Sequence, residues 1–487
     1  MNLKEKLSDK VFKMVGDVAD NISRPCYVVG GYVRDLIIER HSKDIDFVTV
    51  GSGIELAEAV ASRLGPKAHV AVYRNYGTAQ LHCGNLELEF VGARKESYRR
   101  DSRNPIVEDG TLEEDLSRRD FTINALAISV NADSYGELID MFGGMADIEK
   151  RLIRTPLDPD ITFSDDPLRM MRAIRFATQL GFNIYPETLR AITRNAHRIE
   201  IITAERIKDE LSKIMRSPKP SIGWELLHIT GLLKYILPEL EALRGVEVVN
   251  GRGHKDNFYH TLTVLDTVAA SSDKEWLRWA ALFHDIAKPV TKRYDAQNGW
   301  SFHNHNFVGA KMIPRIFSRM RLPLGAEMRY VQKLVELHMR PIALVEDEVT
   351  DSAVRRLINY AEEDLNDLMT LARADITSKN EAKKQRYLDN FDLVERKFDD
   401  IRAKDFERNR KNPIDGNEIM HIFGLHQSPL VGYFAKNLKQ AIKDCEIEDT
   451  REASLEYLYK LAREKGVEVV NPPADNDDTD NGDIQKN

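Results

Sequence analysis

The chain has 487 residues, of which 42% are hydrophobic and 30% charged, so it can bury a sizeable core and is neither wholly disordered nor collagen-like. Its three cysteines, Cys26, Cys83 and Cys445, form no CxxC pair, which argues against disulfide staples and a structural zinc site and favours a reducing, cytoplasmic location. The formal net charge is -8, from 70 basic and 78 acidic residues, but phosphates respond to local patches, so nucleic acid is not excluded as a partner.

The first 150 residues predict strands alternating with helices. We expect an amphipathic helix over residues 1–22, strands at 26–29, 44–50 and 86–94, and a helix from Tyr32 onward. Strands and helices that alternate in this way are typical of a mixed α/β sheet domain.

Beyond about residue 150, helical periodicity dominates as far as residue 466. Residues 471–487 are polar, acidic and rich in turn formers, so we expect a disordered tail. No apolar run approaches the ~18 residues that span a bilayer, and we expect neither a membrane partner nor a signal peptide.

The first candidate site combines a glycine pair with two aspartates. Gly30-Gly31 ends an apolar strand and opens a helix, where a backbone can approach a phosphate. Asp44 and Asp46 stand two positions apart on a predicted strand, so their carboxylates share one face and would attract two divalent cations. Alone, the two aspartates are better explained as solvated acids at a strand edge, and the glycine pair as a plain tight turn.

Several longer motifs follow in a fixed order, and their order is more specific than any one of them. They are GGYVRDLI, DIDFVTV, RRDFTINALAI, DMFGGMADI and DDPLRMMRAIRFATQLGF. Together they resemble the head and neck of bacterial class II CCA-adding tRNA nucleotidyltransferases and of the related bacterial poly(A) polymerases. The resemblance is dense over residues 20–220 and continues more weakly to about 465.

The resemblance implies a polymerase-β-like head that uses Mg²⁺, CTP, ATP and tRNA. Asp44 and Asp46, with Glu89 as a third carboxylate, would be catalytic, and the two aspartates would hold the Mg²⁺ ions. The implied nucleotide-binding residues are Gly30, Gly31, Arg34, Arg118, Arg119, Asp120, Asn124, Asp166, Arg169 and Arg172. Residues 93–112 correspond to a flexible loop that helps the switch from C to A addition.

Asp166 and Arg169 are the candidates for base selection. At positions i and i+3 of a predicted helix they would share one face. Cytosine and adenine both offer an amino group beside a ring acceptor, which a carboxylate and a guanidinium can read, whereas uracil and guanine do not. The alternative is an exposed ion pair that contributes about 0.2–0.5 kcal/mol.

A second candidate site is a set of histidines and aspartates on predicted apolar helices. Imidazole and carboxylate ligands suit Ni, Mn, Fe or Zn better than Ca. The order of these residues resembles the HD superfamily of metal-dependent phosphohydrolases over residues 255–380. The implied core ligands are His260, His284, Asp285 and Asp375, and His305 and His338 match the extra ligands of two-metal members.

The predicted fold class is therefore α+β, with a mixed-sheet nucleotidyltransferase head followed by all-helical parts. The expected boundaries are a head at 1–155, a neck at 156–250, an HD domain at 251–380, an RNA-binding region at 381–470 and the tail at 471–487. We expect a CCA-adding enzyme with an HD phosphohydrolase activity. The alternatives are a poly(A) polymerase, a CC-only or A-only adding enzyme, or an HD phosphohydrolase whose N-terminal half only binds; the oligomeric state is left open.

Overall fold

The computed structural model describes most of the chain, and it divides the chain into two compact units. The described residues are 1–65, 68–74, 77–83, 86–97, 106–249, 252–253, 256–346, 351–377, 381–409, 412–443, 446–448 and 450–471. One unit is Met1–Val394 and the other is Glu395–Asn487. The centre of the expected flexible loop and the expected tail, apart from Asn471, lie outside the described residues.

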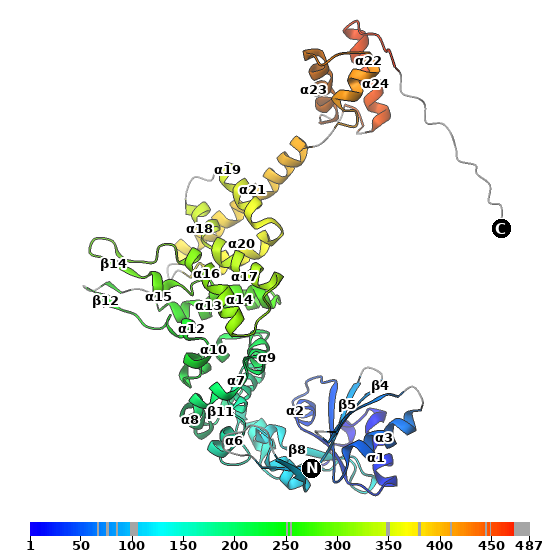
Figure 1. Cartoon of the computed structure of the whole chain (residues 1–487), viewed down its shortest axis with the longest axis vertical. Coiled ribbons are helices and arrows are strands. Elements are labelled where there is room, and N and C mark those ends of the chain that lie inside the picture. The colour runs from blue at the N-terminus through cyan, green and yellow to red at the C-terminus, as the bar shows by residue number, and fades with distance from the viewer. Residues whose placement is uncertain are drawn as a thin grey trace, which may run out of the picture. The chain divides into compact units, whose positions relative to one another are not determined.

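The N-terminal part is built on a mixed seven-stranded sheet (Figure 1). The strand order is β3-β4-β5-β2-β1-β8-β9, and every neighbouring pair is antiparallel except β2 and β5, which are parallel. The strands are β1 Cys26–Val29, β2 Asp44–Thr49, β3 Val70–Tyr73, β4 Thr78–Cys83, β5 Leu86–Gly92, β8 Leu126–Ser129 and β9 Leu138–Asp140. The helices of this part are α1 Lys10–Asn21, α2 Gly31–Ile37, α3 Gly53–Leu64, α4 Leu112–Ser117 and α5 Gly144–Glu149.

The two faces of this sheet have different roles, because alternate side chains point to opposite faces. Ile45 and Phe47 of β2 and Phe90 of β5 belong to the large core that α1 and α3 cover. Asp44, Asp46 and Val48 therefore project from the opposite face, which leaves the two aspartates free of the apolar core.

The N-terminal helix is shorter than predicted. A 3-10 turn, Lys4–Lys6, precedes α1, and the extended Asp9 caps α1 by accepting the backbone N–H of Val11 at 2.9 Å. Asp9 is a strong N-cap residue, so it sets the start of the helix while Leu3 stays buried ahead of it.

The middle of the chain is helical, as the periodicity predicts. Its helices are α6 Pro159–Asp165, α7 Leu168–Leu180, α8 Pro186–Asn195, α9 Ala204–Met215, α10 Ser221–Ile229, α11 Leu233–Ile236, α12 Pro238–Glu241, α13 Asn257–Ser271, α14 Glu275–Phe283, α15 Lys288–Thr291, α16 His305–Arg319, α17 Ala326–Leu337, α18 Met339–Glu346, α19 Asp351–Ala361 and α20 Leu365–Asp375. Short strand pairs interrupt them: β10 Leu152–Ile153 with β11 Asn183–Ile184, β12 Val248–Val249 with β13 Arg252–Gly253, and β14 Arg293–Asp295 with β15 Gly299–Ser301. Strands of two or three residues carry too little periodicity for the sequence to predict them.

Helix α21, Glu381–Asn409, crosses the boundary between the two units. The second unit continues with α22 Gly416–Phe423, α23 Pro429–Lys443 and α24 Arg451–Glu464, which share a core of their own around Ile419, Phe434 and Leu458. Among the described residues, no helix is both long and apolar enough to cross a bilayer.

Candidate functional site

The first site begins at the turn between β1 and α2. Gly30 has a φ of +76°, a conformation that disfavours a side chain. A Cβ atom there would lie 2.9 Å from Nη1 of Arg119 and 3.4 Å from Oδ2 of Asp46. A glycine is required because the turn passes directly against two of the predicted site residues.

The register of β2 and β5 places the predicted carboxylates together. Asp46 is paired with Glu89 across the parallel ladder, and both line a cavity of about 850 Å³ together with Asp44. Burial raises the pKa of Asp46, and the neighbouring Asp44 raises it further although Arg119 opposes this. Burial and the charge of Asp46 raise the pKa of Glu89. The three carboxylates thus form a concentrated negative charge that a cation would stabilise.

This donor set fits Mg²⁺. The cluster offers carboxylate oxygens on adjacent strands, which are the ligands that Mg²⁺ prefers. Burial and the charges of neighbouring carboxylates raise the pKa of Asp46 and Glu89, and a bound cation would offset both effects. Asp44 and Asp46 could therefore hold divalent cations at the edge of the cavity.

A chain of polar contacts connects several of the predicted nucleotide-binding residues that line the cavity. Arg34 donates from Nη1 to the side-chain oxygen of Asn124 at 2.7 Å, and Asn124 donates to Asp120 at 2.9 Å. Arg172 donates from Nε to Asp120 at 2.7 Å. Burial alone would raise the pKa of Asp120, but Arg172 and Asn124 lower it to about 2. These contacts fix the two guanidinium groups at the cavity wall, where phosphates would bind.

Asp115 is a supporting residue that sequence reasoning missed. It is fully buried in α4 and forms ion pairs with Arg118 and with Arg119, the latter at 3.0 Å. Burial raises the pKa of its carboxyl group, but the two arginines lower it overall. An aspartate followed by arginines at i+3 and i+4 is a helical ion-pair spacing that could have identified this residue.

The expectation that Asp166 and Arg169 lie on one helix is wrong. Asp166 is extended, with φ −134° and ψ 98°, and it lies between α6 and α7, which begins at Leu168. Proline disfavours the helical conformation in the preceding residue, and Pro167 follows Asp166 directly. Arg169, in the first turn of α7, donates to the carbonyl of Arg118 at 2.7 Å rather than pairing with Asp166 as in the alternative interpretation.

All residues predicted for nucleotidyl transfer nevertheless line the same cavity. They are Gly30, Gly31, Arg34, Asp44, Asp46, Glu89, Arg118, Arg119, Asp120, Asn124, Asp166, Arg169 and Arg172. The structure adds Arg175 of α7 and Arg206 and Lys213 of α9 to the wall. The last two are distant in sequence from the motifs, so no local pattern linked them to the site.

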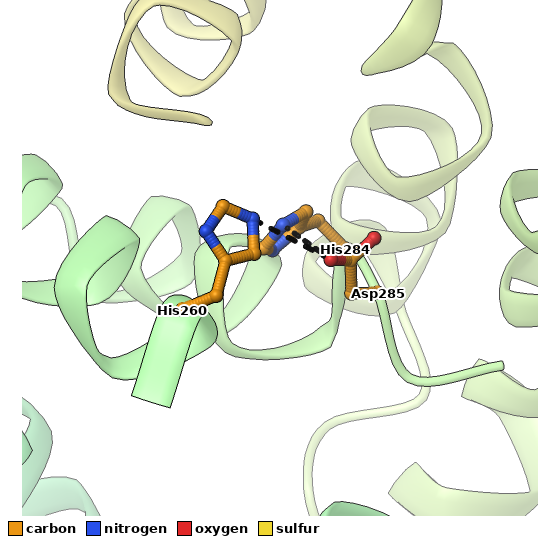
Figure 2. A group of neighbouring side chains, drawn as sticks. All are labelled: His260, His284 and Asp285. Atoms are coloured by element: carbon orange, nitrogen blue, oxygen red, sulfur yellow. Dashed lines mark ion pairs between the residues drawn. The ribbon is translucent and has the colours of Figure 1, made fainter. Parts of the chain in front are cut away.

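The second site lies where several helices of the middle region meet, and it contains every predicted HD ligand. His260 comes from α13, while His284 and Asp285 follow the last turn of α14 (Figure 2). Nε2 of His284 lies 3.3 Å from Oδ2 of Asp285, and Nε2 of His260 lies 3.6 Å from the same oxygen. Asp375, the last residue of α20, approaches His260 Nε2 to 2.8 Å.

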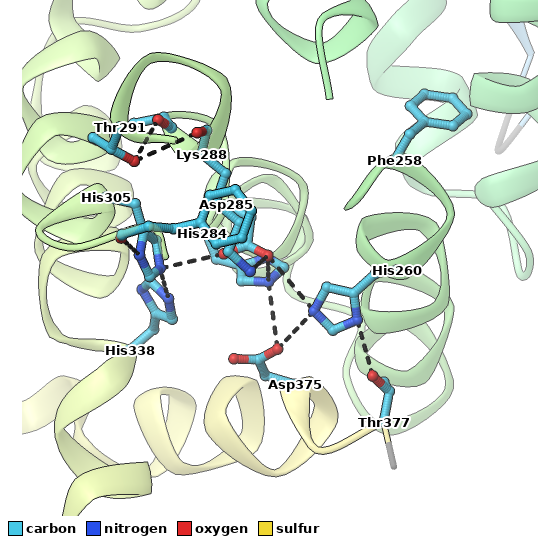
Figure 3. A network of polar contacts seen from close by, with 12 residues as sticks. Phe258, His260, His284, Asp285, Lys288, Thr291, His305, His338, Asp375 and Thr377 are labelled. Carbon is cyan, nitrogen blue, oxygen red and sulfur yellow. Dashed lines mark hydrogen bonds and ion pairs between the residues drawn. The ribbon is translucent and has the colours of Figure 1, made fainter. Parts of the chain in front are cut away.

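Three of the histidine rings in this site (Figure 3) are oriented by hydrogen bonds from Nδ1 to backbone carbonyl oxygens. Nδ1 of His284, His305 and His338 donates to the carbonyl oxygens of Ala281, Phe302 and Val335, at 2.7, 2.8 and 2.7 Å respectively. In a neutral ring, donation from Nδ1 leaves the lone pair on Nε2, and Nε2 faces the centre in each case. This is the arrangement that metal-ligating histidines require.

Asp285 is shared by two potential cation positions. His260, His284 and Asp285 form one group, and Asp285, His305 and His338 form the other. Oδ2 of Asp285 faces the first group, and Oδ1 lies 3.3 Å from Nε2 of His305. One carboxylate can therefore serve both positions.

The electrostatics of this site also fit a cation. Burial lowers the pKa of His284, but Asp285 and Asp375 raise it to about 10, so the carboxylates favour a positive charge at this position. The buried Nε2 of His284 lies 3.3 Å from Asp285 Oδ2 and 3.6 Å from Asp375 Oδ1 without a well-formed hydrogen bond to either. Burial and His284 lower the pKa of His338 to about 4, which keeps it neutral as a ligand must be. Lys288 lies 2.5 Å from Asp285 Oδ2 and adds charge beside the site.

Three family models match successive parts of the chain. Residues 26–154 match the poly(A) polymerase head domain, and residues 181–243 match the probable RNA- and SrmB-binding site of polymerase A. Residues 257–380 match the HD domain. The head model covers the first site except its residues on α7 and α9, and the HD model covers the second site.

Whole-chain comparisons agree with these matches. The chain is 31% identical to an A-adding tRNA nucleotidyltransferase of Deinococcus radiodurans, over 90% of this chain and 95% of that protein. It is 36% identical to a multifunctional CCA protein of Pseudomonas paraeruginosa, over 66% of this chain and 78% of that protein. A solved tRNA nucleotidyltransferase complexed with a primer tRNA and an incoming ATP analogue is 25% identical, with a TM-score of 0.56, over 80% of this chain and 99% of that one.

Proposed function

The chain belongs to the tRNA nucleotidyltransferase family, and we propose that it adds C, C and A to the 3′ end of tRNA in the cytoplasm. CTP and ATP would be the substrates and pyrophosphate the leaving product. One observation carries this proposal: Asp44, Asp46 and Glu89 share a cavity with the Gly30 turn and with a wall of arginines. That cavity offers cation ligands, a close backbone approach and triphosphate-binding groups at one place.

The reaction is an in-line displacement at phosphorus. The 3′-hydroxyl oxygen of the RNA forms a bond to the α-phosphorus, the bond to the bridging oxygen breaks, and pyrophosphate carries away the electron pair. Two Mg²⁺ ions held by Asp44 and Asp46 would neutralise the triphosphate and increase the acidity of the attacking hydroxyl. Glu89, which pairs with Asp46 across the β2–β5 ladder and lines the same cavity, would accept the proton.

The arginines contribute by positioning and by charge. Arg34 and Arg172 are fixed through Asn124 and Asp120, and Arg118 and Arg119 through Asp115. Groups fixed in this way need little reorganisation when the phosphate charge shifts in the transition state. Asp166 and Arg169 would both contact the base. They do not form an ion pair with each other, because each is held by other groups.

The proposal is tested on tRNA transcripts that end before the CCA, after the first C and after the second C. Each is incubated with one labelled nucleotide at a time. We expect CTP to extend the first two and ATP only the third, with UTP and GTP incorporated poorly. Incorporation of neither CTP nor ATP on any of the three ends would contradict the proposal.

A second candidate function is addition of the terminal A alone. The Deinococcus radiodurans relative, which matches over nearly its whole length, is named an A-adding enzyme. The same assay separates the two functions, because an A-adding enzyme would extend only the transcript that already ends in CC.

For the second site we propose hydrolysis of a phosphate ester. A divalent transition metal (Ni, Mn, Fe or Zn) held by His260, His284, Asp285, His305, His338 and Asp375 would supply the Lewis acidity for this reaction. The fixed Nδ1 donors and the shared Asp285 carboxylate support a centre for one or two such ions. If the ammonium group of Lys288 moves away from Asp285, it could bind an oxygen of the substrate phosphate.

A further inference from the structure

The Asp166 carboxylate is held on both of its oxygens. Oδ1 accepts the backbone N–H of Leu168 at 3.1 Å, and Oδ2 lies 3.2 Å from Nη2 of Arg206. Asp166 and Arg206 both line the nucleotide cavity. The orientation of this carboxylate is therefore set jointly by the start of α7 and by a side chain forty positions away in α9.

Arg206 is carried by a helix that is well anchored. Leu211 and Ile214 of α9 are fully buried, and the buried Glu210 lies 2.6 Å from Nε of Arg175 on α7. Arg278 of α14 donates to the carbonyl of Met215 at the end of α9 at 2.7 Å. A guanidinium that extends from such a support can hold its partner in one place.

Arg169 cannot replace this support, because its Nη2 donates to the carbonyl of Arg118 at 2.7 Å. The two base-reading candidates are thus oriented by different groups. Removing Arg206 would free Oδ2 of Asp166, leave the carboxylate held only by the Leu168 N–H, and not disturb the contact of Arg169.

A fixed carboxylate selects a base more strictly than a mobile one. It accepts a hydrogen bond from the amino group of cytosine or adenine, but it repels the carbonyl oxygen that uracil or guanine presents at that position. A carboxylate that can turn away avoids the repulsion, so its release weakens rejection of the wrong base more than acceptance of the right one.

We propose that Arg206 is a positioning residue that sets nucleotide selectivity by holding Asp166. This inference rests on the proposed nucleotidyl transfer, and its test keeps the two separable. Wild-type protein that incorporates neither CTP nor ATP would overturn the proposed function and this inference with it. Wild-type incorporation with unchanged selectivity in the variant would overturn only the inference.

The experiment compares the full-length Arg206→Ala variant with Lys208→Ala, which removes a cation from the same helix outside the nucleotide cavity. The readout is the ratio of kcat/KM for CTP over UTP, and for ATP over GTP, on defined tRNA ends. We expect Arg206→Ala to lower at least one ratio by about tenfold, which is the effect expected from losing one hydrogen bond to a charged group. The KM for tRNA should not change. Lys208→Ala should keep the wild-type ratios.

A double-mutant cycle separates positioning from a general structural effect. Because Arg206 acts through Asp166, adding Arg206→Ala to Asp166→Ala should lower selectivity no further. Independent losses that add in the double variant would overturn the proposal. If Arg206→Ala lowers the Tm, Arg206→Lys takes its place, and its selectivity should lie between that of wild type and that of Asp166→Ala; a wild-type ratio would count against the proposal.

Discussion

At the scale of single residues, many of the functional side chains outside the Asp44, Asp46 and Glu89 cluster have a partner that fixes them. Asp115 fixes Arg118 and Arg119, and backbone carbonyls fix three of the histidines. The sequence motifs identified the functional residues but few of these partners. Carbonyls three positions before a histidine carry no side-chain signature, and Arg206 is linked to Asp166 only by the fold.

The Asp120–Arg172 contact predicts an acid-dependent stability. The pKa of Asp120 falls from an ordinary value of 3.8 to about 2 in the folded protein, so its contribution is present above about pH 4 and is lost as the pH falls towards 2. Thermal melts at pH 5, 4, 3 and 2 should therefore show the gap in Tm between wild type and Asp120→Asn narrowing as the pH falls. A gap that stays constant would show that Asp120 is not stabilised in its charged form.

At the scale of elements, the strongly patterned segments were predictable and the short ones were not. The strands β1, β2 and β5 follow from apolar runs and alternation, and their register then places Asp46 beside Glu89. The break between α6 and α7 was also predictable, because Pro167 disfavours a helical Asp166, but helical periodicity was given more weight. The parallel pairing of β2 with β5 depends on contacts that no local pattern encodes.

Arg278 is the residue on which the junction of α9, α13 and α14 depends. Its buried guanidinium donates to the carbonyls of Met215, Ser217, Ala269 and Ser272. Arg278→Met leaves these carbonyls without that donor, and buried groups left unpaired cost about 1–3 kcal/mol each. We expect a fall in Tm of about 5 °C or more in differential scanning fluorimetry.

The matched control is Arg329→Met, which removes an exposed arginine from α17. It should change the Tm by less than about 1 °C, since exposed substitutions are usually close to neutral. Equal shifts in the two variants would mean that the bonds of Arg278 to the helix ends contribute little.

At the scale of the whole molecule, one chain carries two sites with different donor sets. Carboxylates on a sheet suit Mg²⁺, and imidazoles with carboxylates among helices suit a transition metal. The sequence predicted both sites because each consists of several motifs in a fixed order. The expected domain boundaries remain predictions, and α21 continues through the boundary between the two compact units.

Separate donor sets predict separable activities. Asp285→Asn removes a charge from both cation positions of the second site, so it should abolish hydrolysis of a phosphate ester such as bis-p-nitrophenyl phosphate and lower the Mn²⁺ or Ni²⁺ bound per chain. Nucleotide addition to tRNA should stay within about twofold of wild type, since the first site does not contain this residue. Parallel loss of both activities would indicate that one site serves both reactions.

The most direct test of the account is the rate of pyrophosphate release from CTP and ATP in the presence of tRNA that lacks its 3′ end, measured for wild type and Asp46→Asn. The substitution keeps the shape of the side chain and removes one cation-binding charge from the sheet face that the glycine turn approaches. We predict a loss of about 10³-fold or more, in line with electrostatic catalysis at a transferring phosphoryl group, while phosphate-ester hydrolysis is retained. Pyrophosphate release that persists near the wild-type rate would place the transfer chemistry elsewhere and contradict the account.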